Sequence, residues 1–184
     1  VYLSSTYVEW LRNRVEHTTL VNVHAISRVY KIQSIPTMQP THATSDMNKA
    51  EDRVGDDKLK GTSAWQTFLN QGSPVAVGSD LPVELANPFF GLHAAVTRQD
   101  RNNSPNKGWI PNEAVTVKQA FRGFTLDAAY AAHQEKILGG LTEGKWADFI
   151  LIDQDVFSIS PQNIWKTQIL ETWIAGEKRF TKAP

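Results

Sequence analysis

The residue best suited to chemistry is Asp80, which ends the segment Pro74-Val75-Ala76-Val77-Gly78-Ser79-Asp80. A short apolar run bounded by glycine and polar residues is typical of a buried strand in a parallel sheet. The carboxyl ends of such strands carry catalytic side chains, because the loops there vary while the sheet stays rigid. No Lys or Arg lies close to Asp80 in the sequence. This favours a metal ligand or a general base, and the alternative is an Asp that caps the following turn.

A second titratable side chain ends the segment Arg14–His17, which has the pattern of a brief strand. A helix over residues 23–31 and a strand over residues 34–39 follow, and a helix over residues 64–69 precedes the Asp80 strand. Right-handed crossovers place three such strands side by side and parallel. His17, Gln39 and Asp80 are then expected at one edge of the sheet. The alternative for His17 is a strand-end histidine that bonds only to backbone.

A long polar connection, residues 41–60, separates the second strand from the helix before the third. Loops of this length are functional lids or disordered segments. We therefore predict a loop here, on which His42 and Asp46 can contact a substrate; the alternative is that both are merely solvated. Arg98 can pair with a substrate carboxylate or carbonyl, against the alternative of a surface salt bridge.

The remaining segments predict helices followed by a small β layer. Helices are expected over residues 7–12, 89–96, 116–121 and 125–132, the last capped by Thr125. A strand is expected over residues 148–153 and a hairpin over residues 171–180, with Gly176 at its bend. His24, His93 and His133 lie in helical segments and are expected to be packing or surface residues, and the aromatic side chains of Trp65, Phe68, Phe89 and Phe90 are expected in the core.

Composition limits the kind of partner and the kind of site. The chain has 184 residues, with 19 basic and 19 acidic side chains and no cysteine. A formal charge of zero gives no steering toward nucleic acid or an anionic membrane, and no apolar run approaches the ~20 residues of a membrane span. Without cysteine there are no disulfides or thiolates, so any metal site must use His, Asp and Glu. The chain begins with Val1, as expected of a processed chain or a fragment, and the cytoplasm is the default expectation for its location.

Five ordered motifs resemble the C-terminal part of a metal-dependent amidohydrolase of the amidohydrolase 3 branch, which includes enzymes similar to N-substituted formamide deformylase. The motifs span nearly the whole chain and comprise Arg14-Val-Glu-His17, Met38-Gln-Pro-Thr-His-Ala-Thr-Ser-Asp-Met47, Gly78-Ser-Asp80 with Pro82-Val-Glu84, Gly91-Leu-His-Ala-Ala-Val-Thr-Arg98, and Gly139-Gly-Leu-Thr-Glu-Gly-Lys-Trp-Ala-Asp148. Each motif alone is weak, whereas the ordered set is specific.

The resemblance implies an α/β fold in which residues 1–135 form a partial (β/α)₈ barrel, with strands six to eight, and residues 136–184 form part of a small β-sandwich. It makes His17 a metal ligand and Asp80 both a metal ligand and the catalytic aspartate, with zinc as the expected cofactor. Gln39, His42, Asp46 and Arg98 become the expected substrate contacts. The activity it implies is hydrolysis of C–N bonds other than peptide bonds in a small amide-like substrate.

The chain also departs from the family pattern. A whole barrel takes about 250 residues, and the first-strand His-x-His pair, the bridging ligand of the middle strands and the strand-five histidine are absent here. We therefore expect the parent protein to be the enzyme and this chain alone to be inactive, with an incomplete metal site. The alternative is a truncated, non-catalytic interaction domain. Either a homo-oligomer or a missing N-terminal half is expected to cover the strand edge near Arg14.

Overall fold

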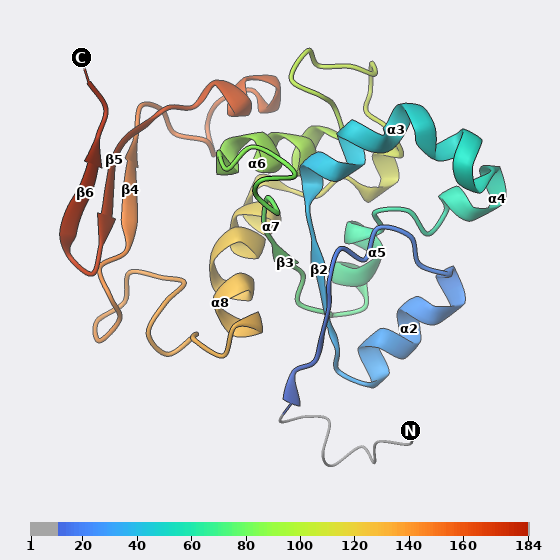
Figure 1. Ribbon diagram of the computed structural model, residues 1–184, viewed down its shortest axis with the longest axis horizontal. Coiled ribbons are helices and arrows are strands. Elements are labelled where there is room, and N and C mark those ends of the chain that lie inside the picture. The colour runs from blue at the N-terminus through green and yellow to red at the C-terminus, as the bar shows by residue number, and fades with distance from the viewer. Residues whose placement is uncertain (1–10, 184) are drawn as a thin grey trace.

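A three-stranded parallel sheet organises the first half of the chain in the computed structural model, which describes residues 11–183 except for the side chains of residues 56 and 57. The strands are β1 (Arg14–Val15), β2 (Ile35–Met38) and β3 (Ala76–Val77), in the order β1-β2-β3. Arg14 pairs with Ile35, and Thr37 pairs with Ala76. The prediction of three adjacent parallel strands is confirmed, although each strand is shorter than its sequence pattern. All four residues of β2 are buried because β2 is the central strand (Figure 1).

Helix α2 (Val23–Lys31) connects β1 to β2, over the residues predicted for it. Its N-cap is Asn22, whose side chain accepts a hydrogen bond from the backbone N–H of His24 at 2.9 Å. Helix α5 (Trp65–Asn70) precedes β3 and buries Trp65 and Phe68. Both crossovers are therefore helical, as parallel neighbours require.

The polar connection after β2 is helical, so the prediction of a loop over residues 41–60 is wrong. Helix α3 (Pro40–Val54) begins directly after the strand, and α4 (Asp56–Leu59) follows. Proline fits the first turn of a helix because its missing N–H has no partner there in any case. The helix buries only Pro40, Ala43 and Ala50. Its remaining surface is polar, which explains why its composition resembles that of a loop.

Helices α6 (Pro88–Thr97) and α7 (Val117–Arg122) start at caps that the sequence predicts. Asn87 accepts from the N–H of Phe89 at 3.0 Å, and Thr116 forms a capping box with Gln119. Thr125, in contrast, caps no helix, because α7 continues through a π-helical turn, η2 (Gly123–Asp127), into α8 (Ala128–Ala131). The Thr125 hydroxyl instead donates to the carbonyl of Phe121 at 2.8 Å.

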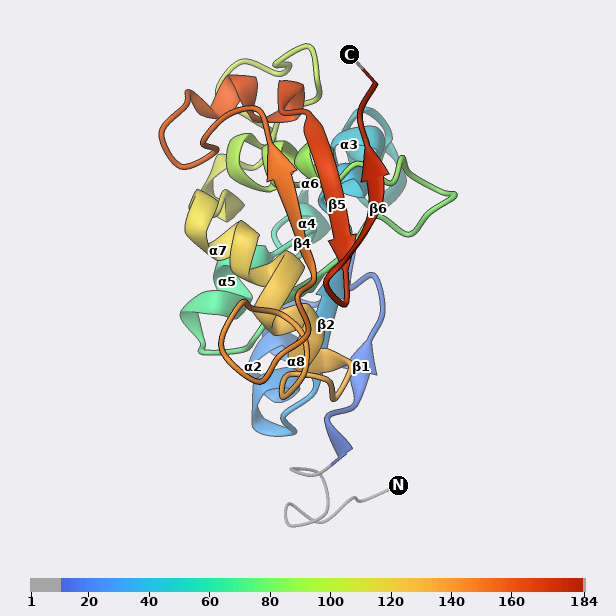
Figure 2. The same ribbon diagram turned by 90° about the vertical axis from the view of Figure 1, so that its left-hand side faces the viewer.

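A second sheet, antiparallel and in the order β4-β5-β6, ends the chain. It contains β4 (Phe149–Ile152), β5 (Ile169–Ile174) and β6 (Glu177–Thr181), which confirms the predicted strand and hairpin. A 3-10 helix, η3 (Pro161–Lys166), lies between β4 and β5 and packs against α6. Figures 1 and 2 show this sheet standing beside the helical body. The other short element is η1 (Pro111–Glu113).

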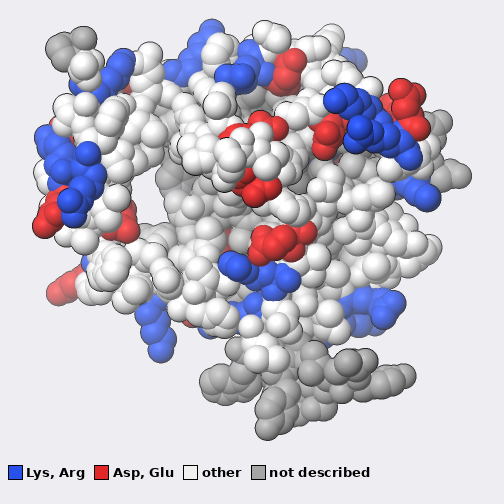
Figure 3. All heavy atoms as spheres, in the orientation of Figure 1, with Lys and Arg blue, Asp and Glu red and all other residues white. Residues whose placement is uncertain are grey.

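The main core lies between α5, α6, β3 and η3. It includes the buried side chains of Trp65, Phe68, Phe89, Leu92 and Ile164. The predicted aromatic core is confirmed for Trp65, Phe68 and Phe89, whereas Phe90 is half-buried. On the face drawn in Figure 3, basic and acidic side chains are interspersed. Within residues 11–183, no helix is both long and apolar enough to cross a membrane.

Candidate metal centre

Three side chains from the carboxyl edge of the parallel sheet converge on one point. His17 follows β1, His42 lies in the first turn of α3 directly after β2, and Asp80 follows β3. Each contributes one potential ligand atom, and these atoms lie within 4.8 Å of one another. His17 and Asp80 are 63 residues apart in the sequence, and the parallel strands that carry them bring them together.

Asp80 is the shared member of the cluster. Its Oδ2 lies 3.7 Å from Nδ1 of His17 and 3.9 Å from Nε2 of His42. Both separations are longer than a hydrogen bond. The Nε2 atom of His42 is buried and has no hydrogen-bond partner. Neither imidazole nitrogen is therefore hydrogen-bonded to the Asp80 carboxylate.

This donor set fits a divalent cation. Ligand atoms on a tetrahedral zinc ion, each about 2.0–2.2 Å from the metal, lie about 3.3–3.6 Å from one another. The separations of 3.7 Å and 3.9 Å around Asp80 Oδ2 are close to that range. Two imidazoles and one carboxylate also match the three-ligand set of catalytic zinc sites, which leave a fourth position for water or substrate. The unpartnered Nε2 of His42 gives this fit independent support.

Backbone strain accompanies the cluster. His17, Thr18 and Asp80 have positive φ angles of 66°, 40° and 57°. A β-branched residue such as Thr18 rarely adopts this conformation, and such outliers persist only where surrounding contacts enforce them. The buried Thr18 hydroxyl supplies those contacts, because it lies 2.7 Å from the carbonyl of Val15 and 3.1 Å from the carbonyl of Thr37. Both acceptors belong to strands of the sheet, so the turn that carries His17 is fastened to β1 and β2.

Gln39 is the nearest polar neighbour of the cluster. Its Oε1 lies 3.0 Å from Nδ1 of His17, the same nitrogen that faces Asp80. Gln39 is the N-cap residue of α3, but its side chain makes no capping hydrogen bond. The side chain is instead turned toward His17, where its oxygen can accept from an Nδ1–H. This nitrogen would bind a metal only after that contact is released.

Residues 6–180 match the Amidohydro_3 model, which describes an amidohydrolase family. The match covers nearly the whole chain. The chain belongs to the amidohydrolase family.

Two curated relatives show how much of such a protein this chain represents. YtcJ of Bacillus subtilis (strain 168) is 29% identical over 171 residues, which are 93% of this chain and 32% of YtcJ. N-substituted formamide deformylase of Arthrobacter pascens is 27% identical over 117 residues, which are 64% of this chain and 21% of that enzyme. The chain therefore spans a fifth to a third of the length of these relatives.

Solved structures of amidohydrolase type share the fold. A metal-dependent hydrolase from Pyrococcus horikoshii OT3 superimposes with a TM-score of 0.72 at 24% identity, over 82% of this chain and 30% of that one. A zinc-bound adenosine deaminase from Xanthomonas campestris gives a TM-score of 0.64 at 17% identity, over 94% of this chain and 38% of that one. At these identities the likeness concerns the fold alone.

Within this amidohydrolase fold, the other predicted substrate contacts lie in different surroundings. Gln39 and His42 lie at the cluster, whereas Asp46 is exposed one helical turn beyond His42 and is not a member of it. Arg98 is 1% exposed, and its guanidinium lies 4.2 Å from the ring centre of Trp65. Burial lowers the pKa of Arg98 to about 10. A substrate role for Arg98 stays a prediction, and it requires the surrounding loops to open.

His42 is the residue whose place the sequence analysis missed. We expected it on a flexible loop, whereas α3 places it rigidly beside Asp80. Pro40 was the available signal, since a proline directly after a strand also marks the first turn of a helix. Of the other histidines, His93 is fully buried in α6, as a packing residue should be, and His24 and His133 are exposed.

Proposed function

We propose that this chain supplies His17, His42 and Asp80 as ligands of a divalent cation, with zinc as the expected ion. We further propose that it is part of a metal-dependent hydrolase of C–N bonds other than peptide bonds. Both proposals rest on the convergence of three potential ligand atoms at the carboxyl edge of the sheet, of which Nε2 of His42 is buried without a hydrogen-bond partner. Membership of the amidohydrolase family supports the reaction class.

The chain's own groups have distinct roles in this proposal. When bound, zinc lowers the pKa of a water ligand toward neutrality and polarises a carbonyl. The two imidazoles bind as neutral ligands. Asp80, with a side chain 36% exposed, can accept the proton of the attacking water and return it to the departing nitrogen. Gln39 lies beside this ligand set, and its contact with Nδ1 of His17 would be released if that nitrogen bound the ion.

We infer the wider architecture from the same family. The parallel sheet corresponds to strands six to eight of a (β/α)₈ barrel, within a domain of residues 1–135. The antiparallel sheet belongs to a small β-sandwich, within residues 136–184. The proposed substrate is a small amide-like molecule, a class supported by the name of the formamide deformylase relative.

The alternative is a non-catalytic domain of amidohydrolase type. The observation that favours it is the ligand set, because the given sequence contains no His-x-His pair. The two candidates differ in whether the cluster holds metal.

Zinc stoichiometry distinguishes the two candidates. The purified chain is treated with a chelator, incubated with zinc and desalted, and its zinc content is measured by mass spectrometry together with amine release from N-substituted formamides. We expect close to one zinc per chain, and loss of this zinc in Asp80→Asn, with Asp46→Asn as the matched control. A zinc content near zero would support the non-catalytic alternative, whereas amine release that depends on zinc and Asp80 would establish the hydrolase in this chain itself.

A further inference from the structure

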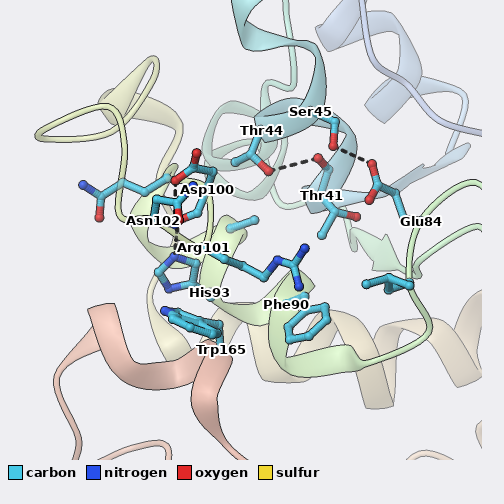
Figure 4. Close-up of a pocket in the computed structure, with 13 residues that line it drawn as sticks. Thr41, Thr44, Ser45, Glu84, Phe90, His93, Asp100, Arg101, Asn102 and Trp165 are labelled. Atoms are coloured by element: carbon cyan, nitrogen blue, oxygen red, sulfur yellow. Dashed lines mark hydrogen bonds between the residues drawn. The ribbon is translucent and has the colours of Figure 1, made fainter.

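A cavity lies beside the proposed metal centre, and none of the three proposed ligands lines it. Its volume is about 430 Å³, within the range of small-molecule sites. Figure 4 shows its walls, formed by the start of α3, Glu84 from the segment after Asp80, Phe90 and His93 from α6, the loop after α6, and Trp165 from η3. The metal centre and the cavity therefore share α3 and the segment that follows β3.

Three charged residues line this cavity, Arg101, Glu84 and Asp100, and none of them forms an ion pair within the described residues. Arg101 extends across the cavity in Figure 4, while Glu84 lies on the far side beside Ser45. The Glu84 carboxylate accepts a hydrogen bond from Ser45 Oγ at 2.6 Å. Over the described part of the chain, no ion pair within 4.0 Å involves Arg101 or Glu84. A positive and a negative group thus face the same space, each free to bind a ligand.

Arg101 is held in place before any ligand arrives. Its guanidinium carbon lies 4.5 Å from the ring centre of Phe90, a cation–π distance. The loop that carries Arg101 is fixed by Asp100, whose Oδ1 accepts from the N–H groups of Asn102 at 2.8 Å and Ser104 at 3.0 Å. A charged group positioned in this way loses little conformational entropy when it binds.

Three residues of the wall also carry buried polar atoms without a hydrogen-bond partner. Gln99 is 7% exposed, and its Nε2 donates to the carbonyls of Asn103 at 3.0 Å and Pro105 at 2.9 Å. Its Oε1 is thereby fixed as an acceptor, and it has no partner. Trp165 Nε1, a donor, and Thr41 Oγ1, which can do either, are also buried without partners. Because these atoms are inaccessible from the cavity, the groups that face a ligand there are Arg101 and Glu84.

We propose that this cavity binds a free α-amino acid in its zwitterionic form. The carboxylate of the ligand pairs with Arg101, its ammonium pairs with Glu84, and its side chain packs against Phe90 and Trp165. A simple anion would leave Glu84 unpaired and a simple cation would leave Arg101 unpaired, whereas a zwitterion pairs with both. The third charge in the wall, Asp100, already accepts from two backbone N–H groups. This inference goes beyond the proposed hydrolase and does not depend on it.

Titration calorimetry with three related compounds tests the proposal. L-Leucine carries both charges, N-acetyl-L-leucine lacks the ammonium, and L-leucinamide lacks the carboxylate. We expect L-leucine to bind the unmodified chain and each derivative to bind at least about tenfold more weakly, because each loses a charge-assisted hydrogen bond. Binding should be the same with chelator and with zinc, since the cavity is separate from the metal centre.

Two variants assign each charge to its residue. In Glu84→Gln, L-leucine and N-acetyl-L-leucine should bind with equal affinity, and in Arg101→Gln, L-leucine and L-leucinamide should do so. Each comparison is a ratio of two affinities measured on the same variant. A partial loss of folded protein affects both affinities equally and therefore cancels. Glu143→Gln and Arg28→Gln, at exposed positions elsewhere, should keep the ratios of the unmodified chain. The proposal is overturned if L-leucine does not bind or if chelation abolishes binding. It is also overturned if Glu84→Gln and Arg101→Gln still bind L-leucine more tightly than the corresponding derivative, by the same factor as the unmodified chain.

Discussion

Arg98 is the largest side chain fully enclosed in the described structure, and it has no carboxylate within ion-pair distance. Its guanidinium lies 4.2 Å from the ring centre of Trp65 and 5.3 Å from that of Trp109. Nε donates to the carbonyl of Trp109 at 2.8 Å, and Nη1 to that of Ser63 at 3.3 Å. Two aromatic faces and two carbonyls therefore compensate a buried charge, and Arg98 joins α6 to the loops around it.

Replacement of Arg98 should destabilise the fold. We expect Arg98→Ala to lower the free energy of unfolding by at least about 2 kcal/mol, because it leaves a cavity and two unpaired carbonyls. Arg28→Ala, at an exposed position of α2, should stay within about 0.5 kcal/mol of the unmodified chain. Urea unfolding followed by circular dichroism measures both. Equal stability of the two variants would show that the enclosed guanidinium contributes nothing.

At the proposed metal centre, the sequence alone predicts the positions of some residues but not of others. His17 and Asp80 could be placed near one another because both end strands, and adjacent parallel strands present their ends at one edge. His42 could not be placed, since a residue predicted on a loop has no defined direction. The buried surroundings of Arg98 depend on Trp65 and Trp109, which meet it only through tertiary packing.

Among the helices and strands, the helix starts that depend on local hydrogen bonds could be predicted from the sequence. The Asn87 and Thr116 caps are short-range hydrogen bonds, and the sequence contains all the groups that form them. Helix α3 was missed because it packs against α6 through a narrow buried strip, which leaves little apolar periodicity. The π-helical turn at Gly123 was missed because close packing on β3 accompanies it, and no local pattern encodes that contact.

Gly123 links helix packing to the metal centre. A Cβ at this position would lie 2.6 Å from Cγ2 of Val77 and 3.0 Å from the carbonyl oxygen of Val75. We expect Gly123→Ala to lower the free energy of unfolding by about 1–3 kcal/mol and to weaken zinc binding, because the displaced strand carries Asp80. Gly140→Ala is the control, since its nearest contact would be an ordinary 3.7 Å. Thermal unfolding and zinc titration test both variants, and a Gly123→Ala protein that is unchanged in both would refute the link.

The pair of Arg12 and Glu135 joins the start of the described chain to the segment after α8. Arg12 Nη2 lies 2.7 Å from Oε1 of Glu135, and this hydrogen bond lowers the pKa of Glu135 from its usual value near 4.5 to about 2. A depressed carboxyl pKa means that the unfolded chain binds the proton more readily. The stabilisation is therefore present above pH 4.5 and is lost as the pH falls to 2.

Acid unfolding should reveal this pair. Between pH 5 and pH 2, stability of the unmodified chain should fall more steeply than that of Glu135→Gln, which lacks the titrating group. The effect should be small because the pair lies near the surface. Urea midpoints at a series of pH values measure the two slopes. Parallel slopes would show that the pair does not form in solution.

At the scale of the whole molecule, the antiparallel sheet exposes an apolar face. Thr172 pairs with both Ile150 and Phe180, so these two side chains share its face, and Ile174 lies on the same face two residues further along β5. Their exposed fractions are 37% for Ile150, 48% for Phe180 and 46% for Ile174. A contiguous apolar surface of this kind favours association.

We therefore expect the isolated chain to self-associate. Its apparent mass in sedimentation velocity should rise with protein concentration, and Ile174→Lys combined with Phe180→Lys should suppress that rise. Leu81→Lys, an exposed apolar position outside the sheet, is the matched control and should not suppress it. A chain that remains monomeric at every concentration would contradict this expectation.

The proposed metal centre requires that His17, His42 and Asp80 bind a single ion together. X-ray absorption at the zinc edge, measured on the zinc-loaded chain, counts the imidazoles bound to the metal. We predict two imidazole ligands together with oxygen ligands, and one imidazole after His42→Ala. A spectrum of the unmodified chain with one imidazole or none, or one that His42→Ala leaves unchanged, would contradict the account.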